Sequence, residues 1–95
     1  MAAVSFKNDI LPLFNSTDIQ HMQGMGVQLN DYSFMSNPAA GSIMGCGPFS
    51  DHGNAQAVYG ALTGNCQPQM PLGGPYWTEA QLQLFQQWMT DGYQP

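Results

Sequence analysis

The sequence predicts a small all-α domain, and three features support this prediction. Apolar residues recur at helical spacing near both ends of the 95-residue chain. A capping-box pattern, Thr78-x-x-Gln81, marks the start of the last helix. Strand-like alternation of apolar and polar residues is absent throughout the sequence. We therefore expect a single domain over residues 1–95, in which short helices are joined by long loops.

The C-terminal helix is expected over 78–91. Its residues Leu82, Phe85 and Met89 share one face at i, i+3 and i+7 spacing. Gly92 follows at the position where a helix C-cap is expected. These signals are local, so they predict this helix independently of the rest of the fold.

An N-terminal helix is expected over 5–14, with Ser5 as its cap. Pro12 either shortens this helix or kinks it near its end, because proline is best tolerated in a first turn. The apolar stripe of this segment consists of Phe6, Ile10, Leu13 and Phe14. Between the termini, further short helices are expected at 17–22, 30–36, 38–44 and 54–62.

Composition excludes several classes of partner. Charged residues make up 7% of the chain, and Lys7 is its only lysine or arginine, so the formal net charge is −5. Nucleic acid is an unsuitable partner, because neutralising phosphates needs several basic side chains on one face. No apolar run approaches the ~20 residues of a membrane span. A surface so poor in charge favours packing against a neighbouring domain or a partner protein.

Enzymatic activity is not expected. The sequence contains no nucleophile with a base at recognisable spacing, no paired carboxylates and no glycine-rich phosphate loop. His52 follows Asp51 in a turn-like stretch and is expected to be a surface histidine. A set of aromatic residues belongs either to the core or to an exposed binding patch: Tyr32, Phe34, Tyr76, Trp77 and Tyr93.

The two cysteines, Cys46 and Cys66, each lie in loop-like sequence beside Gly, Asn or Pro. A disulfide between them would close a loop of about 20 residues and stabilise the domain by on the order of 3 kcal/mol. Free buried thiols and a metal site are the alternatives, although neither cysteine has a second one nearby to form a chelating pair.

Three segments carry a resemblance to a group of bacterial c-type cytochrome domains. The segment 5–14 resembles their Asp-Ile-x-Pro-Ile/Leu-Phe lead-in. The haem-attachment motif C-x-x-C-H follows that lead-in in the family, but here the window is Thr17-Asp18-Ile19-Gln20-His21. His21 is in place, whereas Thr17 and Gln20 occupy the cysteine positions. The segment 69–78 resembles the Met-Pro-x-Gly loop that supplies the distal haem ligand, with Met70 as the sulfur.

The resemblance implies a cytochrome c-like fold in which the N- and C-terminal helices cross and the middle loops wrap around a cofactor cavity. The apolar faces around Ile10, Phe14, Phe85 and Trp88 are its candidates for that crossing. It also implies that His21 and Met70 are remnant ligand positions and that no haem is attached covalently. The family is exported, which indicates the periplasm or another extracytoplasmic compartment. The start of the sequence is typical of a domain taken from a larger protein.

Two functional hypotheses follow. The first is a haem-free cytochrome c-like module with a structural or protein-interaction role and no cofactor, whose cavity is closed by Met22, Met25, Met44 and Met70. The second is a redox or metal-carrying module that binds non-covalent haem or copper through His21 and Met70. For copper, His21 and Met25 form an alternative pair, because residues at i and i+4 share a helix face.

Overall fold

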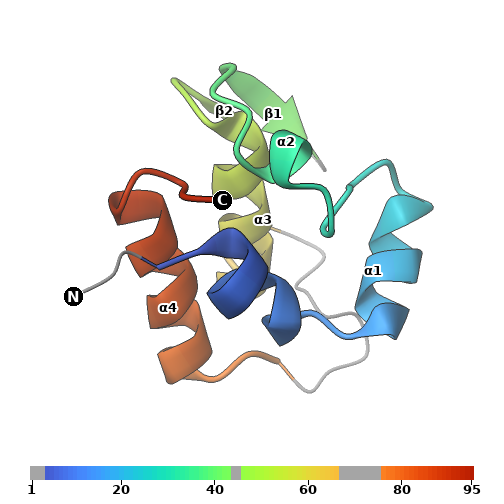
Figure 1. The fold of residues 1–95 in the computed structure, drawn as a ribbon. Coiled ribbons are helices and arrows are strands. Elements are labelled where there is room, and N and C mark those ends of the chain that lie inside the picture. Colours follow the sequence, from blue (N-terminus) through green and yellow to red (C-terminus); the bar gives the residue numbers. More distant parts are fainter. Residues whose placement is uncertain (1–3, 44–45, 67–75) are drawn as a thin grey trace.

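The computed structural model describes residues 4–43, 46–66 and 76–95 (Figure 1). The described chain is a mostly helical small domain with one short two-stranded hairpin. In chain order its elements are η1 (Phe6–Ile10), η2 (Leu11–Leu13), α1 (Ser16–Gln23), α2 (Tyr32–Met35), β1 (Gly41–Ile43), β2 (Cys46–Phe49), α3 (Gly53–Thr63) and α4 (Glu79–Thr90).

Helix α4 confirms the strongest sequence prediction. The Thr78 hydroxyl accepts a hydrogen bond from the Gln81 backbone N–H at 3.2 Å. In return, the Gln81 side chain accepts one from the Thr78 N–H at 2.8 Å. This reciprocal arrangement satisfies donors that the first turn of a helix leaves without partners. Phe85 and Trp88 lie on the buried face of the helix.

The N-terminal segment is helical, as predicted, but it is not one α-helix. Ser5 caps it by accepting a hydrogen bond from the Asn8 N–H at 3.0 Å. The chain then forms one π-helical turn, η1, followed by the 3₁₀ turn η2. Pro12 lies in the first turn of η2, where its missing N–H costs no intrahelical hydrogen bond. Proline thus divides the segment into two tight turns.

The prediction of an all-α domain is wrong for the segment 38–44, since β1 pairs there with β2 in an antiparallel hairpin. Gly41 faces Phe49 and Ile43 faces Cys46, with an irregular register between them. Each strand has only three or four residues, too few to show the alternation that identifies a strand in a sequence. Hydrogen bonds from the segment 52–53 to the carbonyls of 38–39 attach the hairpin to α3.

The other predicted helices are confirmed. Helix α1 corresponds to the prediction at 17–22 and α2 to that at 30–36. Helix α3 corresponds to 54–62 and ends at Gly64, whose φ of 86° lies in the left-handed region that favours glycine. In Figure 1, α3 lies at the centre of the molecule, with α4 on one side and α1 on the other.

The core joins the two ends of the chain. The Phe6 ring of η1 lies 5.5 Å from the Trp88 ring of α4, measured between centroids. The Phe6 N–H donates to the Gln94 carbonyl at 2.9 Å. The described core is a single cluster that also includes Ile10, Phe14, Val27, Leu29, Met35, Val58, Leu62 and Phe85. The predicted contact between the N- and C-terminal elements is therefore confirmed.

Asp91 links the two ends of the chain electrostatically, which predicts a dependence of stability on pH. The Val4 N–H donates to Asp91 Oδ2 at 2.9 Å and the Gln87 side chain donates to Oδ1 at 2.7 Å. Both bonds lower the pKa of the Asp91 carboxyl from its ordinary 3.8, and the bond from Val4 has the larger effect. A lowered folded-state pKa stabilises the domain above pH 3.8, and this contribution is lost as the pH falls through the folded-state value.

We expect Asp91→Asn to remove that part of the acid sensitivity. Urea unfolding across the acid range should show wild type and variant converging as the pH falls below 3.8. A stability difference that stays constant at every pH would contradict the assignment. The carboxyl is exposed to solvent, so added salt should reduce the difference.

Candidate functional site

Two of the predicted ligand positions, His21 and Met25, lie within the described residues. His21 lies on α1 with its side chain exposed to solvent. Met25 follows the end of α1 and is 47% exposed. Met70, the second predicted haem ligand, falls outside the described residues. An exposed histidine can bind a ligand from solvent, but it does not line an internal cavity.

The methionines predicted to fill the cavity separate into different environments. Met22 is 3% exposed and packs in the core, as does Met35 of α2. Met25 is exposed, so the expectation that it fills the core is wrong: it lies beyond the last turn of α1, which turns it away from the core cluster. Met44 lies outside the described residues. Met22 and Met35 act as adaptable filling for an irregular interior.

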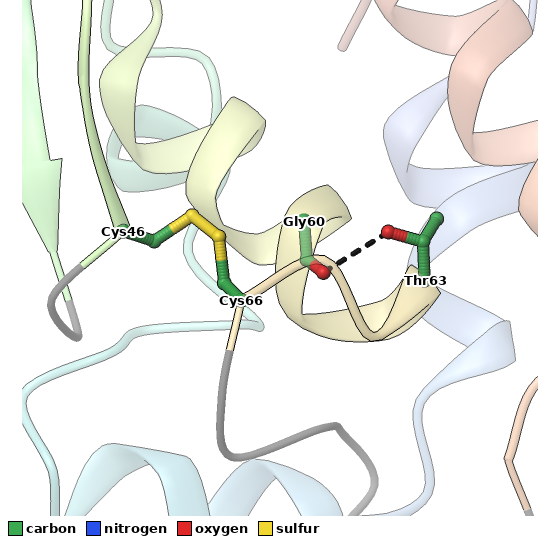
Figure 2. Close-up of a disulfide and its surroundings, with 4 residues drawn as sticks. All are labelled: Cys46, Gly60, Thr63 and Cys66. Carbon is green, nitrogen blue, oxygen red and sulfur yellow. Dashed lines mark hydrogen bonds between the residues drawn. A yellow bond between two sulfur atoms is a disulfide. The ribbon is translucent and has the colours of Figure 1, made fainter.

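Cys46 and Cys66 form a disulfide, as the first of the sequence alternatives predicted (Figure 2). Their Cα atoms lie 5.6 Å apart, within the range that a disulfide spans. The bond joins the start of β2 to the segment that follows α3. Cys46 is only 2% exposed and Cys66 is half-buried, so the disulfide is a partly buried link between the hairpin and the helical body.

The disulfide packs against the backbone of α3 at Gly60. A Cβ atom at this position would lie 2.8 Å from Cys66 Sγ and 3.0 Å from Cys46 Sγ. The Gly60 carbonyl accepts hydrogen bonds from the Cys66 N–H and from the Thr63 hydroxyl, each at 3.0 Å; Figure 2 shows the second of these. Glycine is required here because the sulfur atoms occupy the volume of a side chain.

A second cluster, which the sequence prediction missed, is centred on His52 and Tyr93. Their rings stack with centroids 3.7 Å apart and planes within 3°. Among the described residues, they are the two non-glycine residues with positive φ, 46° and 59°. Such backbone conformations are costly for side-chain-bearing residues and persist only where surrounding contacts hold them. The two strained residues therefore support each other.

Polar groups of Asp51 and Tyr32 lie against the His52–Tyr93 stack. His52 Nδ1 lies 3.7 Å from Asp51 Oδ1 and has no hydrogen-bond partner in the described part of the chain. The Tyr32 hydroxyl donates to the Tyr93 carbonyl at 2.6 Å. Burial, together with the negative charge of Asp51, raises the pKa of the Tyr93 phenol. Tyr93 is therefore a neutral hydrogen-bond donor at ordinary pH.

A surface hollow of about 270 Å³ adjoins the His52–Tyr93 stack. It is lined by Gln56 of α3, by Gln86, Met89 and Thr90 of α4, and by Tyr93. The Gln56 amide donates to the carbonyl and to Oδ1 of Asp51, at 2.6 and 3.0 Å. These two bonds hold the Gln56 carboxamide in one orientation at the edge of the hollow.

The prediction that His52 is a surface histidine beside an acid is only partly correct. Its side chain is 22% exposed, and its ring faces Tyr93, far away in the sequence. The left-handed conformation of both residues depends on packing between segments, and the local sequence contains no signal for it. The order Asp51-His52-Gly53 before a helix was the one available indication of a tight turn.

The described residues contain no group of three or more His, Cys, Asp or Glu side chains arranged to hold a metal ion. Within the same part of the chain, no helix is long and apolar enough to cross a membrane. Comparison with protein-family models, with curated proteins and with solved structures finds no match to this chain.

Proposed function

We propose that this domain is a haem-free module of the cytochrome c-like kind with a structural or protein-interaction role. The observation that carries the proposal is the composition of the described core. Met22 and Met35 belong to the same buried cluster as Phe85 and Trp88, so among the described residues methionine side chains pack with the aromatic residues of the C-terminal helix. His21, the position of the proximal ligand in the resemblance, is exposed instead.

The surface supports an interaction role. With 7% charged residues in the chain, the surface is covered mainly by neutral polar groups, which cost less to desolvate than charged ones. Among the described residues, two large apolar side chains are exposed, Met25 at 47% and Tyr76 at 54%. The disulfide adds rigidity, so the domain meets a partner as a preformed body and loses little conformational entropy on binding.

The test is cofactor binding by the folded protein. We expect protein produced in haem-competent, copper-supplied cells to be colourless and metal-free, and titration with haem to give no Soret band of an axially ligated iron. His21→Ala should shift stability by no more than ~0.5 kcal/mol, the usual scale for an exposed residue. Gln20→Ala, an equally exposed change on α1, is the matched control.

A Soret band or bound copper that is present in wild type and in Gln20→Ala but lost in His21→Ala would overturn the proposal. That result would instead establish the redox or metal-carrying module. Far-UV circular dichroism of each variant separates loss of a ligand from loss of the fold.

A further inference from the structure

The hollow between α3 and α4 has a polar but uncharged lining, and this chemistry restricts what can bind there. Among the described residues that line it, none carries a formal charge: two carboxamides, a hydroxyl, a thioether and a phenol. Its volume of about 270 Å³ is slightly below the range of drug-sized pockets, so it suits a ligand of about one ring.

The polar groups of the hollow are available for binding. In the described part of the chain, the side chains of Gln86 and Thr90 are exposed and make no side-chain hydrogen bond. Gln56 uses its amide nitrogen on Asp51, which leaves its carbonyl oxygen as an acceptor. The hollow thus offers donors and acceptors close together, beside the apolar surface of Met89.

The charges around the hollow argue against a small anionic ligand. Asp51 accepts a hydrogen bond from Gln56, and Asp91 directly follows Thr90 in the chain, so two acids flank the lining. Lys7, the only lysine or arginine of the chain, is exposed on η1 and does not belong to the lining. A phosphate or carboxylate would therefore be desolvated here without a counter-charge. A neutral ligand that carries several hydroxyl groups avoids this cost.

We propose that this hollow binds one uncharged sugar unit, as a free monosaccharide or as part of a glycan. A sugar ring presents hydroxyl groups that both donate and accept, which complements the carboxamides and the Thr90 hydroxyl. Its C–H face is apolar and complements Met89. The stacked His52 holds the Tyr93 ring at the edge of the site, so this wall is already formed before a ligand arrives. This function goes beyond the structural or interaction role proposed above.

The experiment is an amide-resolved NMR titration of the folded, oxidised protein with glucose, galactose and N-acetylglucosamine. Glucuronate, which has the same ring as glucose with a carboxylate added, tests the requirement for neutrality. We expect shifts at millimolar concentrations of at least one neutral sugar, confined to the amides of the hollow: Gln56, Gln86, Met89, Thr90 and Tyr93. Glucuronate should bind more weakly than glucose.

Thr90→Val removes a hydroxyl from the hollow while keeping the shape of the side chain. We expect it to weaken sugar binding about fivefold, the usual effect of losing one hydrogen bond. Thr17→Val, the same change at an exposed position on α1, is the matched control and should bind as wild type does. Absence of shifts with every neutral sugar, glucuronate binding as tight as that of glucose, or equal binding by Thr90→Val and Thr17→Val would each overturn the proposal.

Discussion

Trp88→Ala is expected to destabilise the domain by about 3–5 kcal/mol, the usual cost of removing a large buried aromatic side chain. The Trp88 side chain is fully buried. Its ring lies 5.5 Å from Phe6, 5.5 Å from Phe85 and 5.2 Å from Tyr93, between centroids. Since domains of this size are stable by only about 5–15 kcal/mol, urea unfolding should show a large part of the stability lost.

Two further variants separate the contributions of Trp88. Trp88→Phe keeps an aromatic ring but removes the indole N–H that donates to the Gln94 carbonyl at 2.8 Å, so we expect a smaller loss. Gln83→Ala, at an exposed position on the same helix, should stay within ~0.5 kcal/mol of wild type. If Trp88→Ala were as mild as Gln83→Ala, the terminal elements would not share one core.

Helices α3 and α4 were predictable because the residues that mark each helix lie within that helix or directly beside it. The Thr78–Gln81 capping box forms inside one turn, and Gly64 ends α3 by its own backbone preference. No partner from elsewhere in the chain is needed for either. Such local signals explain why most helix positions in the sequence prediction agree with the structure.

The hairpin and the His52–Tyr93 cluster were not predictable, for the opposite reason. Strands β1 and β2 are too short to show alternation and exist because they pair with each other, while hydrogen bonds from 52–53 hold the preceding residues 38–39. His52 and Tyr93 adopt left-handed conformations and stack on each other across the fold. Interactions between distant segments determine both features, so a propensity-based argument had no signal to use.

The cysteine prediction lies between these two cases. Spacing and context favoured a Cys46–Cys66 disulfide but left free thiols and a metal site open. The structure decides in favour of the disulfide and adds Gly60, which the sequence analysis had not singled out. Gly60 lies six residues before Cys66 and fourteen after Cys46, and no sequence pattern links a disulfide to a glycine at these spacings. The link between Gly60 and the disulfide becomes testable only once the packing is known.

Replacing both cysteines by alanine is the second change for which we expect a large effect. The disulfide closes a 20-residue separation in sequence. Removing it should cost about 3 kcal/mol, because the unfolded chain regains the conformational freedom that the cross-link restricts. Chemical denaturation of the oxidised wild type and of the double variant measures this cost. An unchanged midpoint with an unchanged slope would show that the cross-link does not limit the unfolded chain.

Gly60→Ala is expected to lower the stability of the oxidised wild type but to raise that of the variant without cysteines. In the oxidised wild type the new Cβ meets both sulfur atoms, at 2.8 and 3.0 Å, and overpacking of this kind costs about 1–3 kcal/mol. In the variant without cysteines the sulfur atoms are gone, and Gly60 lies inside a helix. Alanine should then stabilise α3 by up to about 1 kcal/mol, because it is the better helix former.

Gly24→Ala is the matched control for this cycle, since its added Cβ would make only ordinary contacts, the nearest at 3.4 Å from the His21 carbonyl. We expect it to shift stability equally with and without the disulfide. A Gly60→Ala effect of the same sign in both backgrounds would mean that Cys46 and Cys66 do not pack on α3. A change of sign restricted to Gly60 would establish that this glycine provides the space for the disulfide.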